Sequence, residues 1–105
     1  MIVQVHTSPD IEGGERLRTE VEALVASTVE RFADRISRVQ VHLDDQNSSA
    51  KGGGNDKRCM MEARIDGAAP VAVTELAATV EQALNGAADK LERTIDRHLG
   101  RQRDK

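Results

Sequence analysis

Two segments near the middle of the chain alternate apolar and polar side chains residue by residue. In segment 38–44 the apolar positions are Val39, Val41 and Leu43. Because successive side chains of a strand point to opposite faces, this pattern predicts a strand with one buried face. Segment 58–66 repeats the pattern, with Cys59, Met61, Ala63 and Ile65 at the inward positions. Strands of this kind favour a sheet with one face open to solvent.

Apolar residues follow a longer period on either side of these strands. They recur every three or four residues from Glu15 to about Asp34, and again from Leu76 onward. This spacing is typical of amphipathic helices, and Gly100 is expected to end the second one. Short β-branched segments at 2–6 and 71–73 predict a first and a last strand.

The predicted order of elements is therefore β-α-β-β-β-α. It indicates an α+β fold, a two-layer sandwich in which two long helices pack on one face of a four-stranded sheet. A chain of 105 residues is expected to form a single domain over 1–105. The open face of the sheet would display Arg38, Gln40, His42, Arg58 and Arg64.

Segment 45–56 contains three consecutive glycines and hardly any apolar residue. It predicts a mobile loop between two strands, because it cannot bury enough surface to order itself strongly. A phosphate-binding P-loop would end in Gly-Lys-Ser/Thr and open a helix, whereas this loop leads into a strand. A flexible connector is the favoured interpretation.

Composition narrows the class of partner. Phe32 is the only Phe, Tyr or Trp in the chain. Proteins grip unpaired bases by stacking them on aromatic rings, so sequence-specific reading of single-stranded RNA is disfavoured, and nucleic-acid contacts should go to phosphates. A single cysteine excludes an internal disulfide and a cysteine-built metal site. With no signal peptide and no apolar run of membrane length, we expect a cytoplasmic protein that does not contact a membrane.

Charge is sorted along the chain. Residues 90–105 carry six Lys and Arg against three acidic side chains, a net of +3, whereas residues 1–89 carry nine against fifteen, a net of −6. On an ideal helix of about 100° per residue, the cations of the last helix fall within an arc of roughly 80°. They are Lys90, Arg93, Arg97 and Arg101. This arrangement has two interpretations: a solvated helix face with ordinary ion pairs, or a phosphate-binding edge.

Other reactive residues suggest no chemistry. The histidines His6, His42 and His98 lie on different predicted elements, lack the spacing of a metal motif, and are expected to be polar surface or sheet-face residues. The aspartates near strand ends are explained by turn chemistry, and Cys59 is expected to be a small buried apolar residue. A triad assembled only in three dimensions would leave no local spacing. We expect no enzyme activity, no metal or other cofactor, and no small-molecule substrate.

The order of elements and three stretches of sequence resemble a known family, the short ribosome hibernation-promoting factors, also called ribosome-associated inhibitor A or sigma-factor modulation proteins. The stretches are the opening strand 2–6, the strand Met61-Glu62-Ala63-Arg64-Ile65, and the last helix with a basic tail at about 100–105. This helix contains Gln82-Ala83-Leu84-Asn85 and Asp89-Lys90-Leu91-Glu92-Arg93. The resemblance implies a stress-response domain that binds the small ribosomal subunit in the messenger and transfer RNA channel, blocks translation and protects idle ribosomes.

The resemblance also implies a set of contacts to ribosomal RNA phosphates. Lys90, Arg93 and Arg97 match the helix motif of the family, and Arg101 extends it. Arg16, Arg18 and Arg31 in the first helical region are weaker matches to the family. Help is also expected from the sheet-side Arg38, Arg58 and Arg64. The alternative is a divergent family member that acts as a protein-interaction module, through its acidic first helix or the open sheet face, without binding ribosomes. The sequence leaves the oligomeric state open.

Overall fold

The computed structural model describes residues 1–46 and 56–103, and the side chains up to Gly100. Its elements are β1 (Ile2–Thr7), α1 (Gly14–Thr28), the 3₁₀ helix η1 (Glu30–Arg35), β2 (Ile36–Asp45), β3 (Lys57–Ile65), β4 (Val71–Ala77) and α2 (Val80–Arg103). The predicted α+β fold is confirmed. The mobile loop expected at 45–56 falls largely outside the described residues, as does the end of the basic tail.

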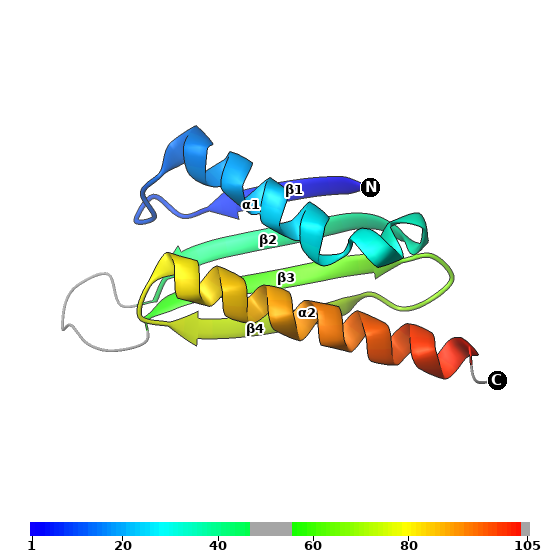
Figure 1. The fold of residues 1–105 in the computed structure, drawn as a ribbon. Helices are drawn as coiled ribbons and strands as arrows, with labels where there is room; N and C mark the ends of the chain where they lie inside the picture. The colour runs from blue at the N-terminus through cyan, green and yellow to red at the C-terminus, as the bar shows by residue number, and fades with distance from the viewer. Residues whose placement is uncertain (47–55, 104–105) are drawn as a thin grey trace.

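The sheet has the strand order β1-β2-β3-β4. β1 and β2 run parallel, joined by α1 and η1, whereas β2, β3 and β4 form antiparallel pairs. Both helices lie across the same face of this sheet and run in the same direction, with α1 toward β1 and α2 over β3 and β4 (Figure 1). No helix among the described residues lies on the opposite face of the sheet, which agrees with the open face predicted from the alternating strands.

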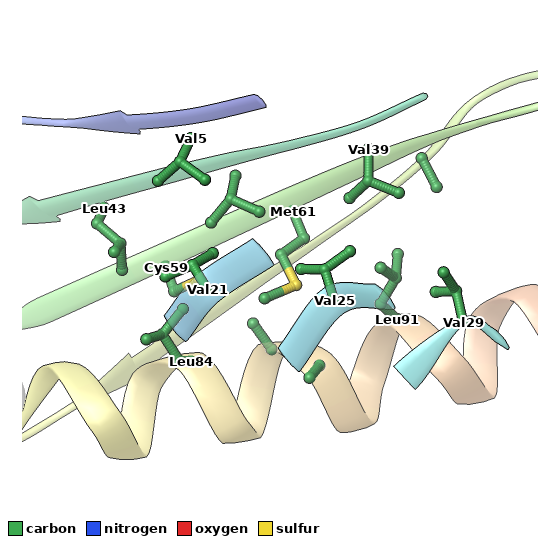
Figure 2. Close-up of a cluster of buried hydrophobic side chains, with 14 of the residues drawn as sticks. Val5, Val21, Val25, Val29, Val39, Leu43, Cys59, Met61, Leu84 and Leu91 are labelled. Carbon is green, nitrogen blue, oxygen red and sulfur yellow. The ribbon is translucent and has the colours of Figure 1, made fainter. Parts of the chain in front are cut away.

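The core lies between the sheet and the two helices (Figure 2). Val21 and Val25 of α1 and Leu91 of α2 are fully buried against Val39 and Met61 of the sheet. Burying one such side chain stabilises the fold by about 1.5–3 kcal/mol. The inward parity predicted for β2 and β3 is confirmed, because every second residue is buried from Val39 to Leu43 and from Cys59 to Ile65.

The first helix ends earlier than predicted. α1 stops at Thr28, and the chain continues as η1 instead of remaining α-helical to Asp34. Ser27, Thr28 and Val29 are weak helix formers. Val29 and Phe32, three residues apart, are both buried, and the Phe32 amide donates to the Val29 carbonyl at 2.8 Å. A 3₁₀ turn places residues i and i+3 on one side, which fits this pair.

The last strand and last helix also differ from the prediction. Leu76 and Ala77 belong to β4 and not to the helix, because they pair with Arg58 and Lys57 of β3. α2 then starts after Thr79, whose hydroxyl accepts a hydrogen bond from the Gln82 amide at 3.1 Å. This contact satisfies one of the free amides of the first helical turn. At the other end the helix continues through Gly100 to Arg103, since a helical glycine costs only about 1 kcal/mol relative to alanine.

Candidate nucleic-acid interface

α2 has three sides with different surroundings. The side facing the sheet is apolar and buried, and it includes Leu84, Leu91 and Ile95. The acidic Glu92 and Asp96 lie on the side that contacts η1. The basic residues lie on an outer side, where Lys90 reaches β4 and Arg93 and Arg97 are exposed. The segregation of charge inferred from the sequence is therefore present in the structure, and each charged side has its own neighbours.

On the acidic side, α2 holds an arginine from η1. Arg31 lies 3.5 Å from a carboxylate oxygen of Glu92 and 3.3 Å from one of Asp96. Its guanidinium also lies over the Phe32 ring, 4.3 Å from the ring centroid. Exposed ion pairs contribute about 0–1 kcal/mol each. Arg31, which was predicted to contact RNA, thus connects η1 to α2.

On the basic side, Lys90 contacts the edge strand β4. Its ammonium donates to the Thr74 carbonyl at 2.8 Å and lies 2.8 Å from a Glu75 carboxylate oxygen. Gly86 makes room for this arrangement, because a Cβ atom at that position would come within 2.6 Å of the Glu75 carboxylate. Lys90, the second residue of the Asp-Lys-Leu-Glu-Arg motif, therefore has a contact within the fold.

A similar contact occurs at the other edge of the sheet. Arg18 of α1 donates to the Val5 carbonyl of β1 at 3.3 Å. Each edge strand thus has a backbone carbonyl capped by a cation that reaches over from a helix. Natural sheets use charged side chains at their edges to prevent pairing with another chain. Sequence periodicity does not reveal such contacts, because they join residues that are far apart in the chain.

Arg93 and Arg97 differ from these two cations. Both are exposed on α2, four residues apart. Within the part of the chain that the structure describes, neither forms an ion pair with a carboxylate. Their guanidinium groups are therefore available to an external anion. Arg101 also belongs to α2, but its side chain lies outside the described residues.

The sheet-side arginines lie on the open face, away from the helices. Arg38 and Arg64 occupy directly opposite positions on β2 and β3, and with Gln40 and Glu62 they line a small hollow. Arg58 lies 3.5 Å from a carboxylate oxygen of Asp44. The predicted RNA-contacting residues are therefore distributed over the outer surface of α2, the junction between η1 and α2, and the opposite face of the sheet.

Further observations concern groups outside the basic surface. Among the described residues, no three His, Cys, Asp or Glu side chains are placed to hold a metal ion. Cys59 is buried as expected, and burial raises the pKa of its thiol to about 12, which disfavours the nucleophilic thiolate. Lys57 is the first residue of β3. Its side chain donates a hydrogen bond to Asp56, which raises the pKa of Lys57, and it also forms an ion pair with Asp45.

The histidines show what sequence reasoning missed. His6 and His42 lie in register on neighbouring strands and stack with ring centroids 4.7 Å apart. They are 36 positions apart in sequence, so no local motif could reveal the pair. His98 lies on α2 and is partly exposed, with its Nε2 atom buried and without a hydrogen-bond partner among the described residues. No described helix is both long and apolar enough to cross a membrane.

Comparison with solved structures shows the same fold in other proteins, among them the following two. One is the N-terminal domain of Thermus thermophilus Protein Y, with a TM-score of 0.72, 23% sequence identity, and coverage of 93% of this chain and 99% of that one. The other is a ribosomal subunit interface protein from Coxiella burnetii, with a TM-score of 0.69, 14% identity, and coverage of 95% and 99%. A search of curated proteins finds no match.

The family comparison extends over almost the whole chain. Residues 3–103 match the family described as sigma 54 modulation protein / S30EA ribosomal protein. This match covers both helices and all four strands except the first residue of β1, and it includes the basic side of α2. The chain therefore belongs to the sigma 54 modulation protein / S30EA ribosomal protein family.

Proposed function

We propose that this protein is a ribosome-associated translation inhibitor of the hibernation-factor type. It binds the small ribosomal subunit in the messenger and transfer RNA channel, and its main contacts are made by the basic side of α2 with ribosomal RNA phosphates. Family membership supports the ribosome as the partner. The name of the Coxiella burnetii neighbour, a ribosomal subunit interface protein, is consistent with this partner.

The observation that carries the proposal is the state of Arg93 and Arg97. Both side chains are exposed, and among the described residues neither has a carboxylate partner. Arginine suits this task because its planar guanidinium can donate two parallel hydrogen bonds to a phosphate. Binding phosphates at these positions would not require any ion pair among the described residues to break.

Other cations of the predicted set would contribute less. Lys90, Arg31 and Arg58 would have to exchange internal carboxylates for phosphates. Each exchange replaces a surface pair worth about 0–1 kcal/mol, so it is feasible but adds little net affinity. Arg38 and Arg64 lie on the open face, so they contribute only where RNA also reaches that side of the sheet.

The inhibition follows from occupation of space. A domain seated in the channel excludes messenger and transfer RNA without any reaction, so no side chain has a catalytic role. Location in the cytoplasm follows from the ribosome as partner. Because the protein carries a net charge of −3, its affinity depends on the local basic surface and not on overall attraction.

Co-sedimentation with vacant small ribosomal subunits tests the proposal. The protein should travel with the subunits at low salt, be displaced by transfer RNA, and dissociate as salt rises, since each phosphate contact releases counterions. Protein that remains at the top of the gradient at low salt would contradict ribosome binding.

The alternative is a protein-interaction module that uses the acidic outer surface of α1. Glu20 and Glu22 are exposed there, and Glu20 has only a distant pair with Arg16 at 3.8 Å. Such a module would bind a basic protein and leave vacant ribosomes unbound. The same sedimentation experiment therefore separates the two functions.

A further inference from the structure

Two imidazole rings lie side by side on the open face of the sheet. His6 on β1 and His42 on β2 are paired in the parallel ladder, and their rings stack 4.7 Å apart with an angle of 17° between the planes. His6 is exposed and His42 is partly exposed. Among the described residues, neither ring has a hydrogen-bond partner. The nitrogen atoms are therefore accessible and uncommitted.

The next position in the same row supplies a sulfur atom. His42 pairs with Met60 of β3, and Met60 pairs with Thr74 of β4, so these side chains share the open face. Directly opposite residues in a sheet have Cβ atoms about 4.5–5.5 Å apart. The row thus presents two imidazoles and a thioether together, and none of its residues is a lysine or arginine that would repel a cation.

This donor set indicates the kind of ion. Neutral imidazole is the commonest protein ligand of transition metals. Among divalent first-row ions, copper binds nitrogen sites most strongly, and a thioether further favours Cu(I). The geometry points to a copper-binding site formed by His6 and His42, with Met60 as an additional ligand for the reduced ion.

Binding requires a small rearrangement. Two parallel stacked rings cannot both direct a nitrogen atom at one ion, so at least one ring must turn about its Cβ–Cγ bond. This torsion is broad in histidine, and both residues are at the surface, so the turn meets little resistance. The backbone already holds the two residues in adjacent strands.

A bound ion would link β1 to β2. β1 is an edge strand that pairs with β2 alone in the sheet. A ligand that binds the folded state alone raises the folding equilibrium constant by the factor 1 + [L]/Kd, which is about 100-fold when the ligand is present at 100 times Kd. Copper should therefore raise the thermal midpoint of the protein.

Titration of the full chain with copper sulfate, followed by calorimetry and thermal unfolding, tests the site. We expect one saturable ion per chain and a raised thermal midpoint. His6→Gln or His42→Gln should each weaken copper binding by more than about tenfold, as expected for loss of one of two nitrogen ligands. His98→Gln is the matched control and should leave the affinity unchanged.

Met60→Leu examines the third ligand. It should weaken binding of Cu(I), titrated anaerobically with a reductant, more than binding of Cu(II). Circular dichroism establishes that each variant is folded, and line broadening of the His6 and His42 ring protons by Cu(II) locates the ion independently. Unchanged affinity in the variant with both His6→Gln and His42→Gln, broadening confined to the N-terminus, or no saturable binding would overturn the site.

Discussion

The two charged sides of α2 look alike in sequence but differ in the structure. On the acidic side, Glu92 and Asp96 both lie against Arg31, so their charges connect α2 to η1. On the basic side, Lys90 caps the β4 edge, whereas Arg93 and Arg97 have no ion pair among the described residues. The charged residues of one helix can therefore differ in role: some stabilise the fold through ion pairs, and others are candidates for contact with a partner. Within this helix, the cations that form no ion pair among the described residues are the better candidates for RNA contacts.

The largest expected effect on stability comes from a substitution on the buried side of α2, which holds both charged sides in place. Leu91 is fully buried, and Leu91→Ala leaves a cavity beneath α2. Such substitutions cost about 2–5 kcal/mol of unfolding free energy. Urea unfolding measures the loss. At temperatures where the variant remains folded, it should still bind ribosomes. Loss of binding by the folded variant would show that Leu91 affects the RNA-binding surface by more than its contribution to stability.

The pKa of the Cys59 thiol provides a test of burial in the core beneath α2. Burial raises the pKa of its thiol from 9.0 to about 12. Because the folded-state pKa is the higher one, the resulting stabilisation is fully present below about pH 9 and is lost as the pH rises through about 12. The midpoint of urea unfolding should therefore fall with rising pH across this interval in the native protein and change less in Cys59→Ala. Equal slopes in both proteins would contradict the burial argument.

Lys90→Met separates the edge contact from RNA binding. The change removes the ammonium from the Thr74 carbonyl and the Glu75 carboxylate and should cost about 1 kcal/mol. It also uncovers the edge of β4, so self-association should increase at high protein concentration. Unfolding and analytical ultracentrifugation measure the two effects. A large loss of ribosome binding with unchanged stability would instead show that Lys90 acts mainly on the ribosome.

The smallest effect is expected on the acidic side. Arg31→Met removes both ion pairs but keeps an apolar chain over Phe32, so unfolding free energy should fall by about 0.5–1 kcal/mol at low salt. The difference from the native protein should shrink at high salt because exposed pairs are screened. A difference that is independent of salt would show that packing, and not charge, is the contribution of Arg31.

Much of the fold could be predicted because it depends on local periods. The two-residue period of β2 and β3 identified the buried and open faces, and the longer period identified both helices. The predictions were wrong where contacts between residues distant in sequence determine the ends of an element. Leu76 and Ala77 became part of β4 because β3 provides partners for them, and α1 gave way to η1 where Val29 and Phe32 are buried three residues apart.

The candidate site was less predictable for the same reason. Helical spacing placed Lys90, Arg93 and Arg97 together, and the structure agrees with that placement. Helical spacing could not show that Lys90 contacts Thr74 or that Arg31 lies against Asp96. Nor could the sequence show that His6 stacks on His42. These contacts depend on strand register and helix packing. Their effect on RNA binding stays a prediction.

Ribosome binding by charge-reversed variants tests the central claim most directly. Arg93→Glu combined with Arg97→Glu should leave the circular dichroism and the unfolding midpoint nearly unchanged and abolish co-sedimentation with small subunits. Arg93→Glu alone should weaken binding and also lower its salt dependence. Arg16→Glu, an exposed change of equal charge on α1, is the matched comparison and should weaken binding far less than Arg93→Glu does. Retained binding in the double variant, or equal losses with Arg93→Glu and Arg16→Glu, would contradict the assignment of this side of α2.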